Sequence, residues 1–132
     1  MRRVILSLAA LAASGLAQAP PPGFPAIQAQ ADLPQGQGPQ VVTQLLRTIP
    51  VGGASGWHSH PGLEITYVLG GITEMRRADG TSLRYATGES FVIPRGVVHN
   101  GVNVGKVPLL LVVTYITDKG APLRIDAPAP SR

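Results

Sequence analysis

The chain has 132 residues, of which 44% are hydrophobic and 14% are charged, so it can form one domain with a hydrophobic core but not two. The formal net charge of +4 at pH 7 is not gathered into a basic stripe beside aromatic residues, which argues against nucleic-acid binding. The chain contains no cysteine, which excludes disulfides, thiolate metal ligands and cysteine nucleophiles.

Residues 1–19 have the layout of a secretory signal peptide: a basic start, an apolar run over residues 4–13, and small residues after it. The run is too short to span a membrane comfortably. Cleavage after Ala17 and cleavage after Ala19 both fit, and the pair of arginines is a weak match to a twin-arginine export signal. The alternative is an apolar N-terminal helix of the mature domain. We expect a signal peptide, and a mature protein that is periplasmic or secreted.

Residues 20–40 contain six prolines together with several glutamines and glycines. This composition is typical of a tether or a loosely packed N-terminal arm, and it does not favour a helix. It also separates the apolar start of the chain from the part that can fold, which supports the signal-peptide interpretation.

From residue 41 onward, short apolar or alternating runs are separated by glycine and proline. Strands are predicted over 41–49, 63–69, 72–77, 82–86, 90–93 and 107–117. The Asp79-Gly80 pair between two of these runs indicates a hairpin. The near-continuous hydrophobicity of 107–117 predicts burial on both faces. Without any convincing amphipathic helix, this pattern predicts an all-β barrel or sandwich over residues 41–126, followed by a loose tail over 127–132.

The three histidines of the chain, His58, His60 and His99, lie in two glycine- and proline-rich segments, and Glu64 follows the first pair. Residues two apart on a strand point the same way, so His58 and His60 can face one ion. His99 must be brought in by the fold, as a barrel does with its inward-facing side chains. Three imidazoles and one carboxylate suit a divalent transition metal and leave one or two coordination positions open. Each of these residues alone could be an ordinary surface or core residue without a ligand role. That explanation becomes weaker because all four occur together.

These residues carry a resemblance to the cupin superfamily. The first cupin motif, G-x5-H-x-H-x3-E-x6-G, is matched by Gly52, His58, His60, Glu64 and Gly71. The second motif, G-x5-P-x-G-x2-H-x3-N, is matched by Gly88, Pro94, Gly96, His99 and Asn103. The resemblance implies a single-domain jelly-roll β-barrel (a double-stranded β-helix) that binds one metal ion. It also implies His58, His60, Glu64 and His99 as the ligands.

Single-domain cupins of this kind resemble quercetinase-like dioxygenases. The resemblance therefore implies a metal-dependent oxidoreductase that acts on a small organic substrate, with one Fe, Mn, Ni, Cu or Zn ion and with Glu64 as both a ligand and a catalytic base. The alternative is a non-catalytic, metal-dependent small-molecule binding protein. A transcription regulator is disfavoured, since no DNA-binding helices are predicted. No nucleic-acid partner and no membrane association after signal removal are expected, and a homodimer is one option for the assembly.

Alternation along the strands indicates which other side chains could line a pocket beside the metal site. If Glu64 faces inward, Thr66 and Val68 share its face by alternation, and Phe91 and Ile93 share one face of their own strand. Four more side chains are candidates to face a substrate, although packing or rim positions are the simpler explanation for each. They are Trp57, Tyr67, Tyr85 and Arg95. The glycines at 71 and 96 are expected to adopt positive φ in tight turns.

Overall fold

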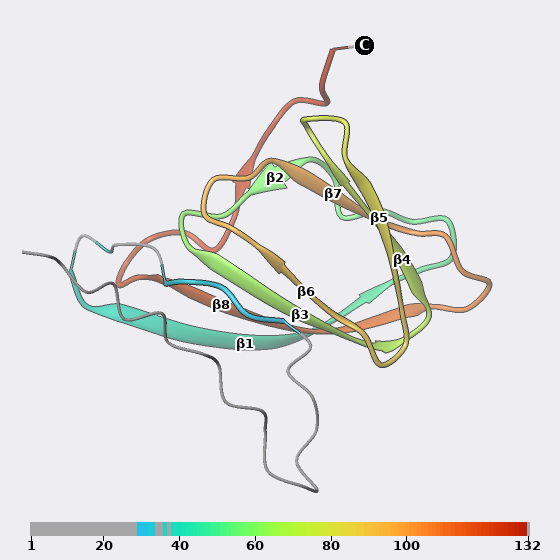
Figure 1. Ribbon diagram of the computed structural model, residues 1–132, viewed down its shortest axis with the longest axis horizontal. Coiled ribbons are helices and arrows are strands. Elements are labelled where there is room, and N and C mark those ends of the chain that lie inside the picture. Colours follow the sequence, from blue (N-terminus) through green and yellow to red (C-terminus); the bar gives the residue numbers. More distant parts are fainter. Residues whose placement is uncertain (1–28, 34–35, 37, 132) are drawn as a thin grey trace, which may run out of the picture.

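Figure 1 shows the computed structural model of the chain, which describes residues 29–33, 36 and 38–131. The expected signal peptide over 1–19 lies outside the described residues, as does most of the expected arm over 20–40. Both therefore remain predictions. In the described part of the chain there is no helix, and so none with the length and hydrophobicity that crossing a membrane requires.

Strands are the only regular secondary structure of the described residues, which confirms the all-β prediction. The strands are β1 (Gln40–Ile49), β2 (His58–Ser59), β3 (Leu63–Gly70), β4 (Ile72–Arg77), β5 (Ser82–Ala86), β6 (Ser90–Ile93), β7 (His99–Asn103), β8 (Leu109–Asp118) and β9 (Ile125–Asp126). Three of them were not predicted, namely β2, β7 and β9. The predicted hairpin joins β4 to β5, with Gly80 at a φ of 89°.

The strands form two antiparallel sheets that enclose the interior of the barrel (Figure 1). One sheet has the order β1-β8-β3-β6, and the other has the order β5-β4-β7-β2-β9. Consecutive strands therefore often lie in different sheets, as in a jelly roll. Side chains that face inward from both sheets meet in one core, which includes Val68, Ile93, Leu109 and Val113.

Strand β8 differs from the prediction of burial on both faces. Its odd-numbered residues from Leu109 to Thr117 are buried, whereas the alternate residues are partly or well exposed, with Leu110 at 40% exposure. The sheet thus has one buried face, and the apolar residues on its other face lie at the surface. Hydrophobicity alone could not separate these cases, because apolar side chains also occur on exposed sheet faces.

Two glycines of the predicted turns have the backbone conformation that was expected. Gly71 has a φ of 91° in the β3–β4 turn, and Gly96 has a φ of 75° before β7. Residues with a Cβ rarely adopt such angles. The Gly96 amide also donates a hydrogen bond of 2.9 Å to the carbonyl oxygen of His60, so this turn ties the two histidine segments together.

Candidate metal centre

Four side chains from both sheets meet inside the barrel. His58 of β2 and His99 of β7 are cross-strand partners in the five-stranded sheet. Glu64 belongs to β3 in the opposite sheet, where it pairs with Tyr115 of β8. His60 follows the end of β2, so the expectation that one strand carries His58 and His60 holds only for the first of them. The fold nevertheless brings together all four residues predicted from the sequence.

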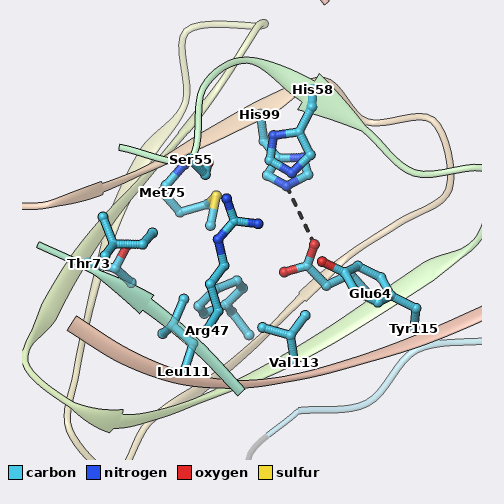
Figure 2. A pocket seen from close by; sticks show the side chains of 13 residues that line it. Arg47, Ser55, His58, Glu64, Thr73, Met75, His99, Leu111, Val113 and Tyr115 are labelled. Atoms are coloured by element: carbon cyan, nitrogen blue, oxygen red, sulfur yellow. Dashed lines mark hydrogen bonds and ion pairs between the residues drawn. The ribbon is translucent and has the colours of Figure 1, made fainter. Parts of the chain in front are cut away.

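The four side chains are almost completely enclosed, with relative exposures of 3%, 1%, 5% and 1% for His58, His60, Glu64 and His99. One ligand atom from each lies within 4.8 Å of all the others. Metal–ligand bonds of about 2.1 Å place neighbouring ligand atoms about 3 Å apart and opposite ones about 4 Å apart. The cluster therefore has the dimensions of a mononuclear site, and Figure 2 shows His58, His99 and Glu64 converging on it.

Each imidazole has its Nδ1 atom beside a backbone carbonyl oxygen. The Nδ1 atoms of His58, His60 and His99 lie 2.7, 2.5 and 2.9 Å from the carbonyl oxygens of Gly56, Leu123 and Val97. A carbonyl oxygen only accepts hydrogen bonds, so the neutral rings carry their proton on Nδ1 and leave a lone pair on Nε2. These carbonyls are the partners that orient metal-binding histidines. Sequence reasoning could not identify them, because any residue type supplies a carbonyl.

The contact between His60 and Glu64 indicates whether the four side chains suit a bound cation. Nε2 of His60 lies 2.6 Å from Oε2 of Glu64 but makes no hydrogen bond. With the ring proton on Nδ1, this contact would place two lone pairs against each other. A cation between the imidazoles and the carboxylate removes that repulsion, and the nitrogen and oxygen donors suit a borderline or hard divalent ion. The residues present therefore fit a metal ion.

The electrostatics of the site also favour cation binding. Burial lowers the pKa of His58 to about 4, with repulsion from His99 and Arg124 adding to the effect, so this ring is neutral at pH 7. Burial would raise the pKa of Glu64, but its contacts with His60 and His99, which are attractive when Nε2 carries a proton or a cation lies between the atoms, and the Thr66 hydrogen bond outweigh burial and hold that pKa well below its usual range. The site thus presents neutral imidazole and an ionised carboxylate, the protonation states that a metal ion requires.

Thr66 fixes the carboxylate from the side opposite the imidazoles. Its side chain is fully buried, and its hydroxyl donates a hydrogen bond of 2.6 Å to Oε1 of Glu64. This leaves Oε2 directed at His60 and His99. The alternation predicted for Glu64, Thr66 and Val68 is confirmed, since all three are buried on the inner face of β3.

We expect Thr66→Val to weaken metal binding by about 10-fold, since loss of a hydrogen-bonded partner of a ligand costs less than loss of the ligand itself. Competition against a chromophoric chelator would measure the change. Thr73→Val is the matched control, because Thr73 is equally buried but its hydroxyl donates only a long bond of 3.4 Å to the Val102 carbonyl oxygen. Equal affinities for the two variants would contradict the role given to Thr66.

A cavity of about 20 Å³ adjoins three of the four residues. His58, Glu64 and His99 contribute to its wall, and most of the remaining wall is apolar. The other lining residues are Arg47, Ile49, Ser55, Thr73, Met75, Phe91, Gly101, Leu111, Val113 and Tyr115 (Figure 2). A metal site that opens onto a cavity can exchange or bind a further ligand, in contrast to a closed structural site.

Phe91 lines this cavity and shares the buried face of β6 with Ile93, as expected, whereas the four candidate substrate-facing side chains do not line it. Tyr67 lies on the outer face of β3, and Tyr85 packs against Phe91 with ring centroids 4.7 Å apart. Trp57 borders a separate surface groove. The Nη1 atom of Arg95 lies 3.7 Å from Oδ2 of Asp118.

Sequence reasoning missed four polar residues of the wall, namely Arg47, Ser55, Thr73 and Tyr115. Arg47 shares the inward face of β1 with Leu45 and Ile49, so a charged residue within an alternating apolar stripe was the available signal. Tyr115 lies in the near-continuous apolar run of β8, where no alternation marks the inner face. Burial and the charge of Glu64 raise the pKa of Tyr115 to about 12, so its hydroxyl remains protonated.

Comparison with solved structures finds the same fold in many proteins. An oxalate oxidase in complex with the substrate analogue glycolate is 28% identical, with a TM-score of 0.56 over 64% of this chain and 45% of that one. A second oxalate oxidase structure is 29% identical, with a TM-score of 0.52 over 59% of this chain and 46% of that one. This chain thus matches less than half the length of these oxidases.

A conserved protein from Klebsiella pneumoniae with a double-stranded β-helix domain matches more of the chain. It is 22% identical, with a TM-score of 0.56 over 83% of this chain and 90% of that one, which shows a common fold. No curated protein matches this chain.

The model of the cupin domain family matches residues 45–115, which is more than half of the chain. The matched region includes β2, β3 and β7, which carry or flank all four residues of the cluster. Together with the double-stranded β-helix neighbours, this match shows that the chain belongs to the cupin family.

Proposed function

We propose that this chain is a mononuclear metalloenzyme that carries out dioxygenase-like chemistry on a small organic substrate. The observation that carries the proposal is the placement of four buried ligand atoms within 4.8 Å of one another beside a cavity. The oxalate oxidases, at 28% and 29% identity, provide support from relatives that act on a small acid.

In the proposed enzyme, His58, His60, Glu64 and His99 hold the ion, which is one of Fe, Mn, Ni, Cu or Zn. When bound, the ion supplies Lewis-acid or redox chemistry at its open positions. The chain supplies the rest: the three backbone carbonyls fix the imidazole tautomers, Thr66 fixes Glu64, and the apolar wall excludes water from the cavity.

Glu64 is the residue that we propose for proton transfer. Its low pKa keeps it ionised and suited to bind a cation, and makes it a weak base while those contacts hold. It would accept a proton at Oε2 only after this oxygen leaves the ion, while Oε1 keeps the Thr66 hydrogen bond. Loosening of the contact with His60 would raise its basicity.

The size of the cavity bears on the substrate. Quercetinase-type cleavage of a flavonol is the reaction favoured by the motif resemblance, but a flavonol is far larger than a cavity of about 20 Å³. It would require the barrel wall to open. Chelating acids of a few non-hydrogen atoms need much less rearrangement of the wall. We therefore propose that a search for the substrate should include such acids as well as flavonols.

The proposal predicts O₂ consumption by the loaded protein. Protein loaded separately with Fe(II), Mn(II), Ni(II) and Cu(II) should take up O₂ with at least one member of a panel of flavonols, diketones and small acids, and metal-free protein should not. His99→Ala, prepared in parallel, should be inactive because it lacks one ligand. Absence of turnover with every metal, in protein shown to contain one ion per chain, would contradict the enzymatic proposal.

The second candidate is a metal-dependent binding protein without catalysis. The observation that favours it is the cavity wall, where Glu64 is the only carboxylate among the described residues and is tied to the ligand cluster. Saturable ligand binding that requires the metal, with no O₂ uptake, would identify this function.

We also propose that the mature protein is exported and forms a homodimer. The basic and apolar start of the sequence supports export. Exposed apolar side chains on the outer face of the β1-β8-β3-β6 sheet support dimerisation. They include Val42, Leu46, Leu69 and Leu110.

A further inference from the structure

Arg47 extends from β1 into the cavity beside the candidate metal centre. In β1, Leu45, Arg47 and Ile49 face the interior, and Arg47 pairs across the sheet with Leu111 of β8. Figure 2 shows the guanidinium inside the cavity, on the side where His58 and His99 lie. An arginine thus occupies an inward position of the strand whose neighbours on that face are apolar, next to four residues that suit a metal.

The guanidinium of Arg47 makes no hydrogen bond or ion pair with a described residue and interacts with Tyr115 only through its charge. Every other arginine that the structure describes has a polar contact. Arg76 and Arg84 contact Glu74, Arg77 contacts the Val92 carbonyl oxygen, Arg95 contacts Asp118, and Arg124 contacts Asp126. An arginine that reaches the interior without a carboxylate is available to an anionic ligand.

The charge of the cavity also favours an anion. Among the described residues, Glu64 and Arg47 supply the only carboxylate and the only guanidinium of its wall, and imidazoles that bind an ion do so in the neutral form. A divalent ion, one carboxylate and one guanidinium sum to +2. An excess positive charge in a largely apolar enclosure is unfavourable, and an anion of one or two charges offsets it.

We propose that Arg47 binds the carboxylate of a small anionic substrate and so selects carboxylic acids for the metal centre. This inference rests on the proposed function and names its substrate class. The planar guanidinium can pair with both carboxylate oxygens, which fixes the orientation of the substrate as well as its charge. The cavity of about 20 Å³ has room for about one water molecule, so the smallest carboxylic acids need the least opening of the wall, and the Tyr115 hydroxyl offers a further donor there.

The test compares glycolate with its uncharged match, glycolamide, as probes of Zn-loaded protein, because zinc supports no redox turnover. Isothermal titration calorimetry should show that wild-type protein prefers glycolate. Arg47→Met, which keeps the length of the side-chain stem, should bind glycolate about 10–100-fold more weakly, as expected for loss of a charged hydrogen-bonded pair. Its affinity for glycolamide should change little.

Arg84→Met is the matched control, since it removes an equal charge from an exposed side chain outside the cavity. Arg47→Lys keeps the positive charge but cannot form the bidentate pair, so it should also lose affinity for glycolate. This second variant serves as the test if Arg47→Met does not fold. Zinc content is measured for every protein. Full zinc content with unchanged glycolate affinity in either Arg47 variant would overturn this inference alone. A wild-type protein that binds no metal would overturn it together with the proposed function.

Discussion

His60→Ala should lose nearly all of its bound metal, with the metal-to-protein ratio falling from about one to below about 0.1 after dialysis. His60 is 1% exposed, and its Nε2 atom lies closest to Glu64 in the cluster. The alanine variant removes one of four ligands and leaves the Leu123 carbonyl oxygen without its donor. Elemental analysis of dialysed protein measures the ratio.

Tyr115→Phe is the control for this experiment. The tyrosine ring packs against His60, with centroids 4.7 Å apart, so the phenylalanine variant keeps the packing and all four ligands. It should retain its metal. Full metal content in His60→Ala would show that the ion binds elsewhere.

Gly62→Ala should destabilise the fold by about 3 kcal/mol or more, at the upper end of the cost of overpacking. A Cβ at this position would lie 2.0 Å from the carbonyl oxygen of Ile116 and 2.9 Å from Cα of Thr117. Both are backbone atoms of β8, an interior strand of its sheet, so neither can move away without disturbing the strand. Because Gly62 lies between His60 and Glu64, the same displacement should also lower metal affinity. Urea unfolding of the metal-free protein measures the change in the free energy of unfolding.

Gly38→Ala is the matched control. Gly38 is exposed, and an added Cβ there meets nothing within 4 Å, so its free energy of unfolding should stay within about 0.5 kcal/mol of wild type. A Gly62→Ala protein as stable as this control would show that the loop between His60 and Glu64 does not lie against β8 as described.

The strand pattern was largely predictable from the sequence because turn residues separate the runs. The bounds of β4, β5 and β6 agree with the predicted ranges, and those of β1 and β3 differ by one residue at one end. The strands β2, β7 and β9 were missed for a physical reason. β2 and β9 contain two residues each, and β7 contains Asn and Gly, which have low strand propensity, so cross-strand pairing in the barrel defines them.

The four candidate ligands were predictable because metal binding requires particular side chains. His and Glu at these spacings are rare outside metal sites of this kind. The groups that orient them were not, since Leu123 contributes a backbone carbonyl 63 residues away from His60. The inward placement of Arg47 also required the structure. Its direction depends on the pairing of β1 with β8, which sets the face of each residue.

His58, His60, Glu64 and His99 are expected to hold one ion together. A crystal structure of the metal-loaded protein, with data collected at the absorption edge of that metal, tests this expectation most directly. We expect one anomalous peak about 2.0–2.3 Å from Nε2 of His58, His60 and His99 and from Oε2 of Glu64. A fully loaded protein with its peak elsewhere, or with imidazoles that contact the ion through Nδ1, would contradict it.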